Sequence, residues 1–107
     1  MSAEELEHTR AMSEVLFGQR YRLEAMVAIA SAQDGLVCLT DLARLLDLTP
    51  SNLQGPLRDL ARCGLLTRLP PDDSKRRYYQ RNDSLAWPFA VEIARRAKHI
   101  RLVSERS

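Results

Sequence analysis

The side chains best suited to recognising a ligand form a polar row at the start of one expected helix. Thr49 and Pro50 mark a helix N-terminus. A threonine side chain accepts a hydrogen bond from a free backbone N–H at the helix start, and a proline at the first position has no N–H that would need a partner. The helix is expected over 50–63, where three leucines line one face. Its other face offers hydrogen-bond donors and acceptors that suit base edges or phosphate oxygens. The members of this row are Thr49, Ser51, Asn52, Gln54 and Arg58.

A second set of candidate residues is cationic. Residues 70–74 read Pro-Pro-Asp-Asp-Ser, which is strong turn chemistry. Apolar and aromatic runs at 65–69 and 78–81 flank the turn and predict two short strands. The pattern therefore predicts a β-hairpin with a charged tip that is suited to phosphate contact. The bases at that tip are Lys75, Arg76 and Arg77.

The charge is distributed unevenly along the chain. Residues 1–50 carry four arginines and eight acidic residues, net −4, whereas residues 51–107 carry twelve cations and six acidic residues, net +6. A basic half is typical of a phosphate-contacting surface, although charge alone fits an ordinary solvated surface equally well.

Length and composition predict one compact domain over 1–107, because 107 residues with 45% hydrophobic content suit a single core. No apolar run approaches the roughly 20 residues that span a bilayer, and the acidic N-terminus lacks the apolar stretch of a signal peptide. We therefore expect a cytoplasmic protein with no membrane partner.

Nothing in the sequence has the spacing of a catalytic or metal site. Cys38 and Cys63 are expected to be free thiols, with Cys63 packed in the core, and His8 and His99 lie near opposite ends of the chain. There is no Gly-rich phosphate loop and no nucleophile with an assignable base. These observations predict that the protein is not an enzyme and needs no metal or cofactor.

Helical periodicity and caps predict the elements that position the candidate residues. Helices are expected over 3–17, between Ser2 and Gly18, and over 20–32. Residues 36–39 form a short apolar run that predicts a strand. Thr40 then looks like the N-cap of a short helix over 41–46, with Leu42, Leu45 and Leu46 facing inward.

The order of these elements is that of a winged helix-turn-helix, mainly α with a small β-hairpin (α+β), with flanking N- and C-terminal helices. The sequence resembles the bacterial regulators of the ArsR and MarR types over about residues 17–82. The resemblance is carried by Leu39–Leu53, by Leu57-Arg58-Asp59-Leu60-Ala61-Arg62-Cys63-Gly64-Leu65-Leu66, and by the MarR-like wing tip Pro71–Arg77. Some ArsR-type proteins carry a Cys-x-Cys metal-binding segment. Here the matching stretch is Cys38-Leu39-Thr40, so one of the two thiols is missing and metal sensing at this segment is not expected.

The flanking helices, 1–17 and 85–104, build the dimer in the resembled families. The last helix has an apolar stripe that fits a coiled-coil-like seam, although it also fits a stripe that only closes the monomer's core. The residues we expect at a dimer interface are Leu6, Leu16, Phe17, Phe89, Ile93, Ile100 and Val103. Trp87 is expected in the core or at that interface.

The resemblance implies a homodimeric regulator, in its simplest form a repressor, that binds a pseudo-palindromic DNA operator. Two alternatives stay open: a winged-helix protein-interaction module, and a sensor of a small molecule or of redox state. Gly55-Pro56 favours the interaction module slightly, since proline inside a helix predicts a kink or a separate 3₁₀ first turn. The effector of a sensor is unknown from the sequence.

Overall fold

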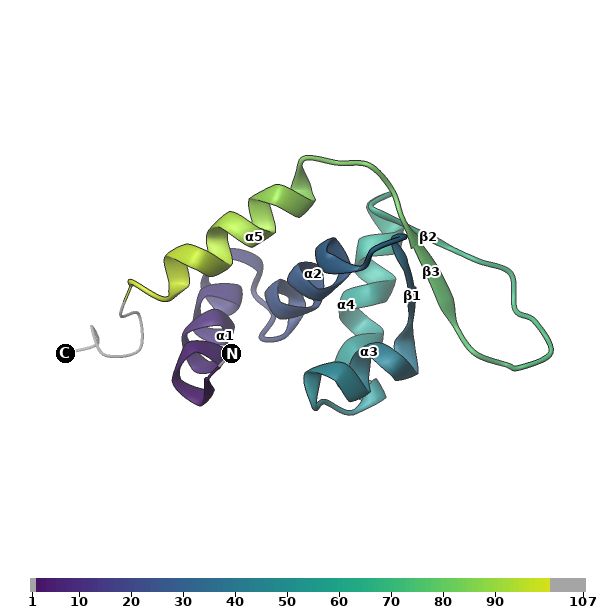
Figure 1. The fold of residues 1–107 in the computed structure, drawn as a ribbon, viewed down its shortest axis with the longest axis horizontal. Coiled ribbons are helices and arrows are strands. Elements are labelled where there is room, and N and C mark those ends of the chain that lie inside the picture. The colour runs from purple at the N-terminus through teal and green to yellow at the C-terminus, as the bar shows by residue number, and fades with distance from the viewer. Residues whose placement is uncertain (1, 101–107) are drawn as a thin grey trace.

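The computed structural model describes residues 2–100 and contains five helices and three short strands (Figure 1). The hairpin projects from one end of the molecule, and the first and last helices lie toward the other end. None of the helices within 2–100 has the length and hydropathy to cross a membrane. The elements are α1 Ala3–Phe17, α2 Arg22–Ser31, β1 Leu36–Cys38, α3 Leu39–Leu46, α4 Pro50–Arg62, β2 Leu66–Arg68, β3 Tyr78–Arg81 and α5 Ala86–Ala97.

The predicted caps of α1 are confirmed. The Ser2 backbone N–H donates to Glu5 Oε1 and the Glu5 N–H donates to Ser2 Oγ, both at 3.1 Å, which forms a capping box. Gly18 closes the helix in the left-handed conformation, at φ 68°. The helix is tied to α2 by a buried ion pair, in which Arg10 Nε donates to Glu24 Oε1 at 2.6 Å. This pair was not predicted from the sequence.

The core forms around α2. Leu23, Ala25 and Ile29 are fully buried, and the helix packs against both α1 and α5. Arg81 of β3 donates to three carbonyls at the end of α2, those of Ile29, Ala30 and Ala32, at 2.7 to 3.0 Å. A strand residue thereby satisfies the free carbonyls of a helix C-terminus and fixes α2 against the sheet.

The sheet has three antiparallel strands in the order β1-β3-β2, so β3 lies in the middle. Val37 faces Tyr79 in one pair of strands and Arg68 faces Tyr79 in the other. The hairpin and the strand at 36–39 were predicted separately, and the structure joins them. As a result the start of α3 lies next to the base of the hairpin, since the Leu39 N–H donates to the Arg77 carbonyl at 3.1 Å.

Two predictions for α3 are wrong. The helix begins at Leu39 with Cys38 as its N-cap, so Thr40 lies inside the helix and does not cap it. Leu45, expected to face inward, is 73% exposed. The reason is that β1 passes directly into the helix, and the buried stripe therefore starts one turn earlier, with Leu39, Leu42 and Ala43 in the core.

The last helix is shorter than the predicted 85–104. It ends at Ala97, residues 98–99 form a turn, and 101–104 lie outside the described residues. Trp87 is buried, and its Nε1 donates to the Asn82 carbonyl at 2.7 Å, so the indole anchors the start of α5. This places Trp87 in the core, one of the two positions expected for it.

Candidate nucleic-acid interface

The polar row begins at the N-terminus of α4, where local hydrogen bonds order the helix start. Thr49 is the N-cap and Pro50 the first helical residue, as predicted. The Thr49 N–H donates to Asn52 Oδ1 at 3.2 Å, and the Thr49 hydroxyl lies 2.9 Å from both Asn52 Oδ1 and Ser51 Oγ. The Asn52 Nδ2 group has no hydrogen-bond partner among residues 2–100. Asn52 therefore both caps the helix and keeps a donor for a ligand.

The two faces of α4 differ as the sequence predicts. Leu53, Leu57 and Leu60 are buried and fix the helix to the core. Ser51, Gln54 and Arg58 are exposed on the remaining surface. The helix therefore presents amide, hydroxyl and guanidinium groups outward from a rigidly packed element, which is the arrangement that base-edge and phosphate contacts need.

The Gly55-Pro56 pair does not divide α4. The helix is continuous from Pro50 to Arg62, so the separate 3₁₀ turn is not formed there. Pro56 is buried, and it lies on the core side with Leu53 and Leu57. Packing of this apolar face holds the helix together despite the backbone hydrogen bond that a proline lacks.

An ion pair with α2 orders the last turns of α4. Arg22 Nη2 donates to Asp59 Oδ2 at 2.8 Å, while Arg58 Nε lies 3.8 Å from the other oxygen of the same carboxylate. Asp59 is thus engaged mainly by Arg22. The Arg58 guanidinium, whose side chain is 67% exposed, stays available at the surface.

The hairpin tip, here called the wing (residues 70–77), is ordered by its own polar groups. The Ser74 hydroxyl and the Ser74 N–H both donate to Asp72 Oδ1, and these two hydrogen bonds, the hydroxyl first, lower the pKa of Asp72 below its ordinary range. The Lys75 N–H donates to the Asp72 carbonyl at 3.2 Å, and Lys75 adopts a left-handed φ of 62°. These contacts form the predicted turn and expose the three bases of the tip.

One base of the wing is held against α3. Arg76 Nη1 donates to Asp41 Oδ2 at 3.3 Å, and Asp41 also accepts from Arg44 at 3.3 Å. A hydrogen bond with the Tyr78 side chain, and then the Asp41 charge, raise the pKa of Arg76, so this guanidinium is charged at any physiological pH. The sequence analysis missed Asp41, although its spacing of three residues from Arg44 is an ordinary helical ion-pair signal.

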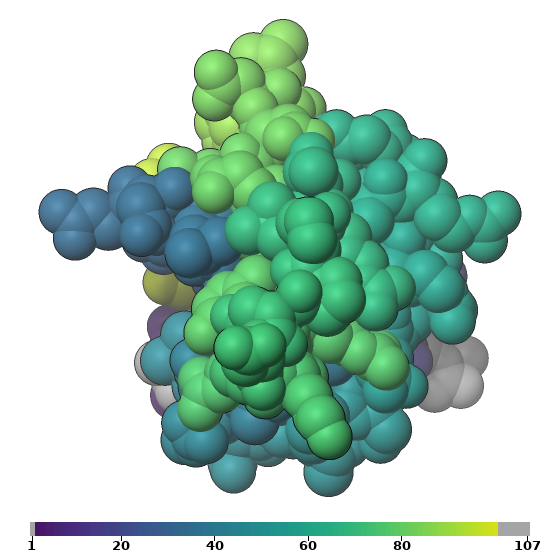
Figure 2. Space-filling view, turned by 90° about the vertical axis from the view of Figure 1, so that its right-hand side faces the viewer, coloured from purple at the N-terminus to yellow at the C-terminus, as the bar shows by residue number. Residues whose placement is uncertain are grey.

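The wing and the two helices of the motif share one end of the molecule. In Figure 2 the wing points toward the viewer, teal side chains of the α4 region flank it, and α3 lies below. All eight predicted contact residues lie in α4 with its cap or in the wing, and seven of them are exposed while Asn52 is half-buried. The structure thus brings the two predicted sets, separated by about 20 residues in the chain, to neighbouring surfaces.

The residues expected at a dimer interface differ in their exposure. Leu16 and Phe89 are each 46% exposed, and Ile100 is also exposed. Phe17 and Ile93 instead pack against the protein's own core. Leu6 is half-buried, and Val103 lies outside the described residues.

The prediction for the two cysteines is confirmed in one part and wrong in the other. Both are free thiols, but Cys63 is exposed at the C-cap of α4, so its expected core position is wrong. Cys63 follows the last helical residue, Arg62, and precedes the left-handed Gly64, so it lies at the open end of the helix. Cys38 is the buried thiol. Among residues 2–100, no three His, Cys, Asp or Glu side chains are grouped so as to hold a metal ion.

Comparison with solved structures identifies the fold. The chain is similar to a MarR family transcriptional regulator from Streptomyces coelicolor, solved in complex with DNA, with a TM-score of 0.60 and 23% sequence identity over 97% of this chain and 71% of that one. No family model and no curated protein matches the sequence. The architecture is therefore a MarR-like winged helix, as the resemblance in the sequence implied.

Proposed function

We propose that this protein is a transcriptional regulator that binds double-stranded DNA. In this proposal α4 enters the major groove and the wing lies over the backbone or the minor groove. The likeness of the fold to a regulator solved with DNA supports the proposal, and so does the general docking mode of helix-turn-helix proteins. A catalytic role has no comparable support, since the similar structure is that of a regulator.

The observation that carries the proposal is the pairing of two exposed surfaces at one end of the fold. The start of α4 presents Ser51, Gln54 and Arg58, and the wing presents its three bases. The α4 region and the wing are neighbours in Figure 2. Side-chain amides and hydroxyls read base edges, and guanidinium groups bind guanine or phosphate. We therefore assign sequence preference to Asn52 and Gln54, and assign most of the nonspecific affinity to the wing.

We further propose that the protein acts as a homodimer and represses transcription by occupying a pseudo-palindromic operator. One recognition helix with three wing cations neutralises few phosphates, whereas a two-fold dimer doubles the contacts and reads two half-sites about one helical turn apart. Leu16 on α1 and Phe89 on α5 are large apolar side chains that are exposed. They support a contact between two protomers at the end of the molecule away from the wing.

The structure weakens one argument for the interaction-module alternative. Gly55-Pro56 predicted a kink or a separate 3₁₀ turn in the recognition helix, and α4 is one continuous helix from Pro50 to Arg62. The sensor alternative is compatible with DNA binding, because a regulator with a ligand site would combine both activities.

The test is selection of bound fragments from the source genome, followed by affinity measurement on the selected duplex at several salt concentrations. We expect affinity to fall steeply with salt, by nearly one unit of log–log slope for each phosphate engaged. Arg76→Ala with Arg77→Ala should weaken binding to every duplex, whereas Gln54→Ala should mainly reduce the preference for the selected sequence.

The matched control is Arg95→Ala with Arg96→Ala, which removes the same charge from an exposed part of α5. Equal losses from the α5 pair and the wing pair would show that only net charge matters, and would contradict the proposed docking. If the folded protein binds no duplex even at low salt, DNA binding itself is contradicted.

A further inference from the structure

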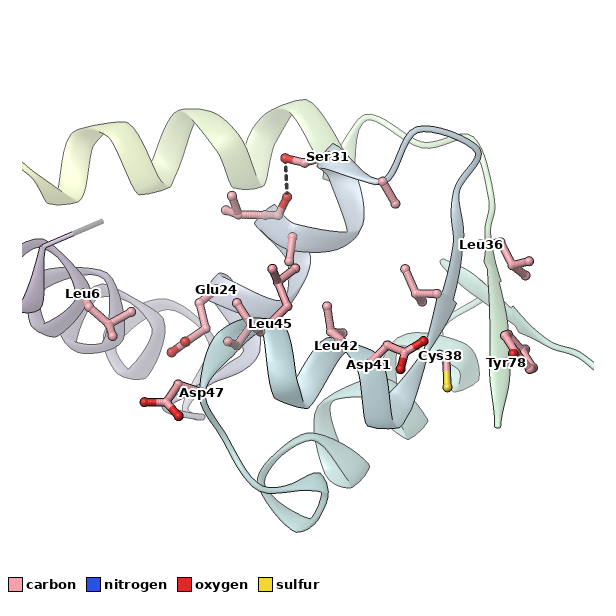
Figure 3. Close-up of a pocket in the computed structure, with 15 residues that line it drawn as sticks. Leu6, Glu24, Ser31, Leu36, Cys38, Asp41, Leu42, Leu45, Asp47 and Tyr78 are labelled. Carbon is pink, nitrogen blue, oxygen red and sulfur yellow. Dashed lines mark hydrogen bonds between the residues drawn. The ribbon is translucent and has the colours of Figure 1, made fainter. Parts of the chain in front are cut away.

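One recess in the described chain is lined by no residue of α4 or of the wing. It is a groove of about 730 Å³ between α1, α2, β1 and α3, here called the α2–α3 groove (Figure 3). Its walls are mostly aliphatic, with Val27 and Ala28 from α2, Leu36 from β1, and Leu42 and Leu45 from α3. The volume falls within the range of small-molecule sites, which are also predominantly apolar.

Three carboxylates, and no Lys, Arg or His, stand among the lining residues. In Figure 3, Glu24 and Asp47 lie toward the α1 end of the groove and Asp41 lies toward β1, with Leu42 and Leu45 between them. An apolar recess with carboxylates at both ends is complementary to an apolar molecule that carries positive charge.

These carboxylates are not equally free. Glu24 is 3% exposed and paired with Arg10, and Asp41 is shared between Arg44 and Arg76. Asp47 has no ion pair within residues 2–100, and it is the C-cap of α3. The carbonyl end of a helix carries partial negative charge, which adds to that of the carboxylate. The negative potential in the groove is therefore strongest beside Leu45 and Asp47.

Leu45 supports the same assignment. It is 73% exposed although its neighbours Leu42 and Ala43 are in the core, and Leu36 across the groove is 40% exposed. Large aliphatic side chains on facing walls of one groove present apolar surface that a ligand removes from water, at about 25 cal/mol for each Å².

We propose that the α2–α3 groove binds a lipophilic cation, an aromatic or aliphatic molecule with a delocalised or quaternary positive charge. The apolar body lies against Val27, Leu42 and Leu45, and the charge lies near Asp47. This site goes beyond the proposed function and does not depend on it, because the shape and charge of the groove carry it whether or not the protein binds DNA.

The test uses a pair of probes of the same shape and opposite charge. Binding of tetraphenylphosphonium and of tetraphenylborate to the full chain is measured by equilibrium dialysis in the absence of DNA. We expect saturable 1:1 binding of the cation and at least tenfold weaker binding of the anion. Equal binding of both ions, or no saturable binding of the cation, would overturn the proposal.

Variants locate the site. Asp47→Asn should weaken cation binding about threefold, as expected from Coulomb attraction over roughly 6 Å in a water-like medium. Asparagine tolerates the left-handed backbone at this position, φ 58°, so the variant should fold. Asp83→Asn, which changes another exposed carboxylate outside the groove, should change nothing.

Ser31→Trp, which fills the groove from its exposed rim, should abolish binding while leaving the melting temperature near that of the parent. Full retention of binding in this variant would place the cation elsewhere and overturn the assignment. A chain that binds the cation but no DNA would contradict only the proposed function, and the converse result would contradict only the groove.

Discussion

Replacing Asp41 with asparagine should tighten binding to DNA. Asp41 is the carboxylate nearest to a wing base, with 3.3 Å between its Oδ2 and Arg76 Nη1. In the proposed complex it opposes binding in two ways, because it competes with phosphate for Arg76 and it repels phosphate directly. Asparagine keeps the shape of the side chain and removes both effects.

The size of the gain follows from the exposure of the pair. The Arg76 and Asp41 side chains are 45% and 49% exposed, and such surface pairs contribute about 0–1 kcal/mol. Releasing a pair worth about 0.5 kcal/mol tightens binding about twofold. Repulsion between a carboxylate and a phosphate roughly 8 Å apart in water adds about as much again. We therefore expect a total gain of about fourfold for each protomer at low salt, declining as salt screens the charges.

The assay is fluorescence anisotropy with the selected duplex at several salt concentrations, together with urea unfolding of the free protein. The matched control is Glu92→Gln, which breaks another exposed arginine–carboxylate pair, that with Arg96 at 2.9 Å on α5. The control should leave affinity unchanged. Weaker binding by the Asp41→Asn protein, with stability preserved, would refute the reasoning, because it would mean that the ion pair holds the wing in its binding position.

Three further predictions concern the fold and the assembly. Leu57→Ala should lower the free energy of unfolding by about 3 kcal/mol in urea, because Leu57 is fully buried, whereas Leu45→Ala should change it by less than about 0.5 kcal/mol. The Ser2 backbone N–H donates to the Glu5 carboxylate and lowers its pKa, so the capping box stabilises the fold at neutral pH and this stabilisation is lost as pH falls through the lowered pKa. An NMR titration should find the Glu5 midpoint below that of an unstructured glutamate. A midpoint at or above that value would contradict the capping geometry. Phe89→Glu should convert the proposed dimer to a monomer in sedimentation experiments and steepen the dependence of DNA binding on protein concentration, whereas unchanged sedimentation would place the interface elsewhere.

The parts of the fold that the sequence predicted correctly are those fixed by local chemistry. Ser2 and Gly18 bound α1, and Thr49 with Pro50 starts α4, because capping groups act within four residues of the atoms they satisfy. The turn at 70–74 likewise depends on hydrogen bonds between residues two or three apart. The order of these elements was then enough to predict the winged helix.

The errors in α3 come from one misplaced boundary. Assigning Leu39 to the strand and the cap to Thr40 moved the expected apolar stripe to residues 42, 45 and 46. The observed buried positions are 39, 42 and 43, with Leu46 half-buried, a spacing of three, four and seven from the first residue. That pattern is present in the sequence, but it can be recognised only once the helix is known to start at Leu39.

The position of the wing relative to α3 could not be predicted by any local rule. Asp41 and Arg76 are 35 residues apart, and nothing in either segment indicates that the two side chains pair. They meet because β3 pairs with β1 as well as with β2, which places the Arg77 carbonyl against the Leu39 N–H at the point where strand becomes helix. Sheet order is set by long-range packing, here by Val37 and Tyr79 in one core. The carboxylate that a phosphate would displace from Arg76 in the proposed complex is therefore placed there by the topology, and exchanging Asp41 tests the topology and the proposed function together.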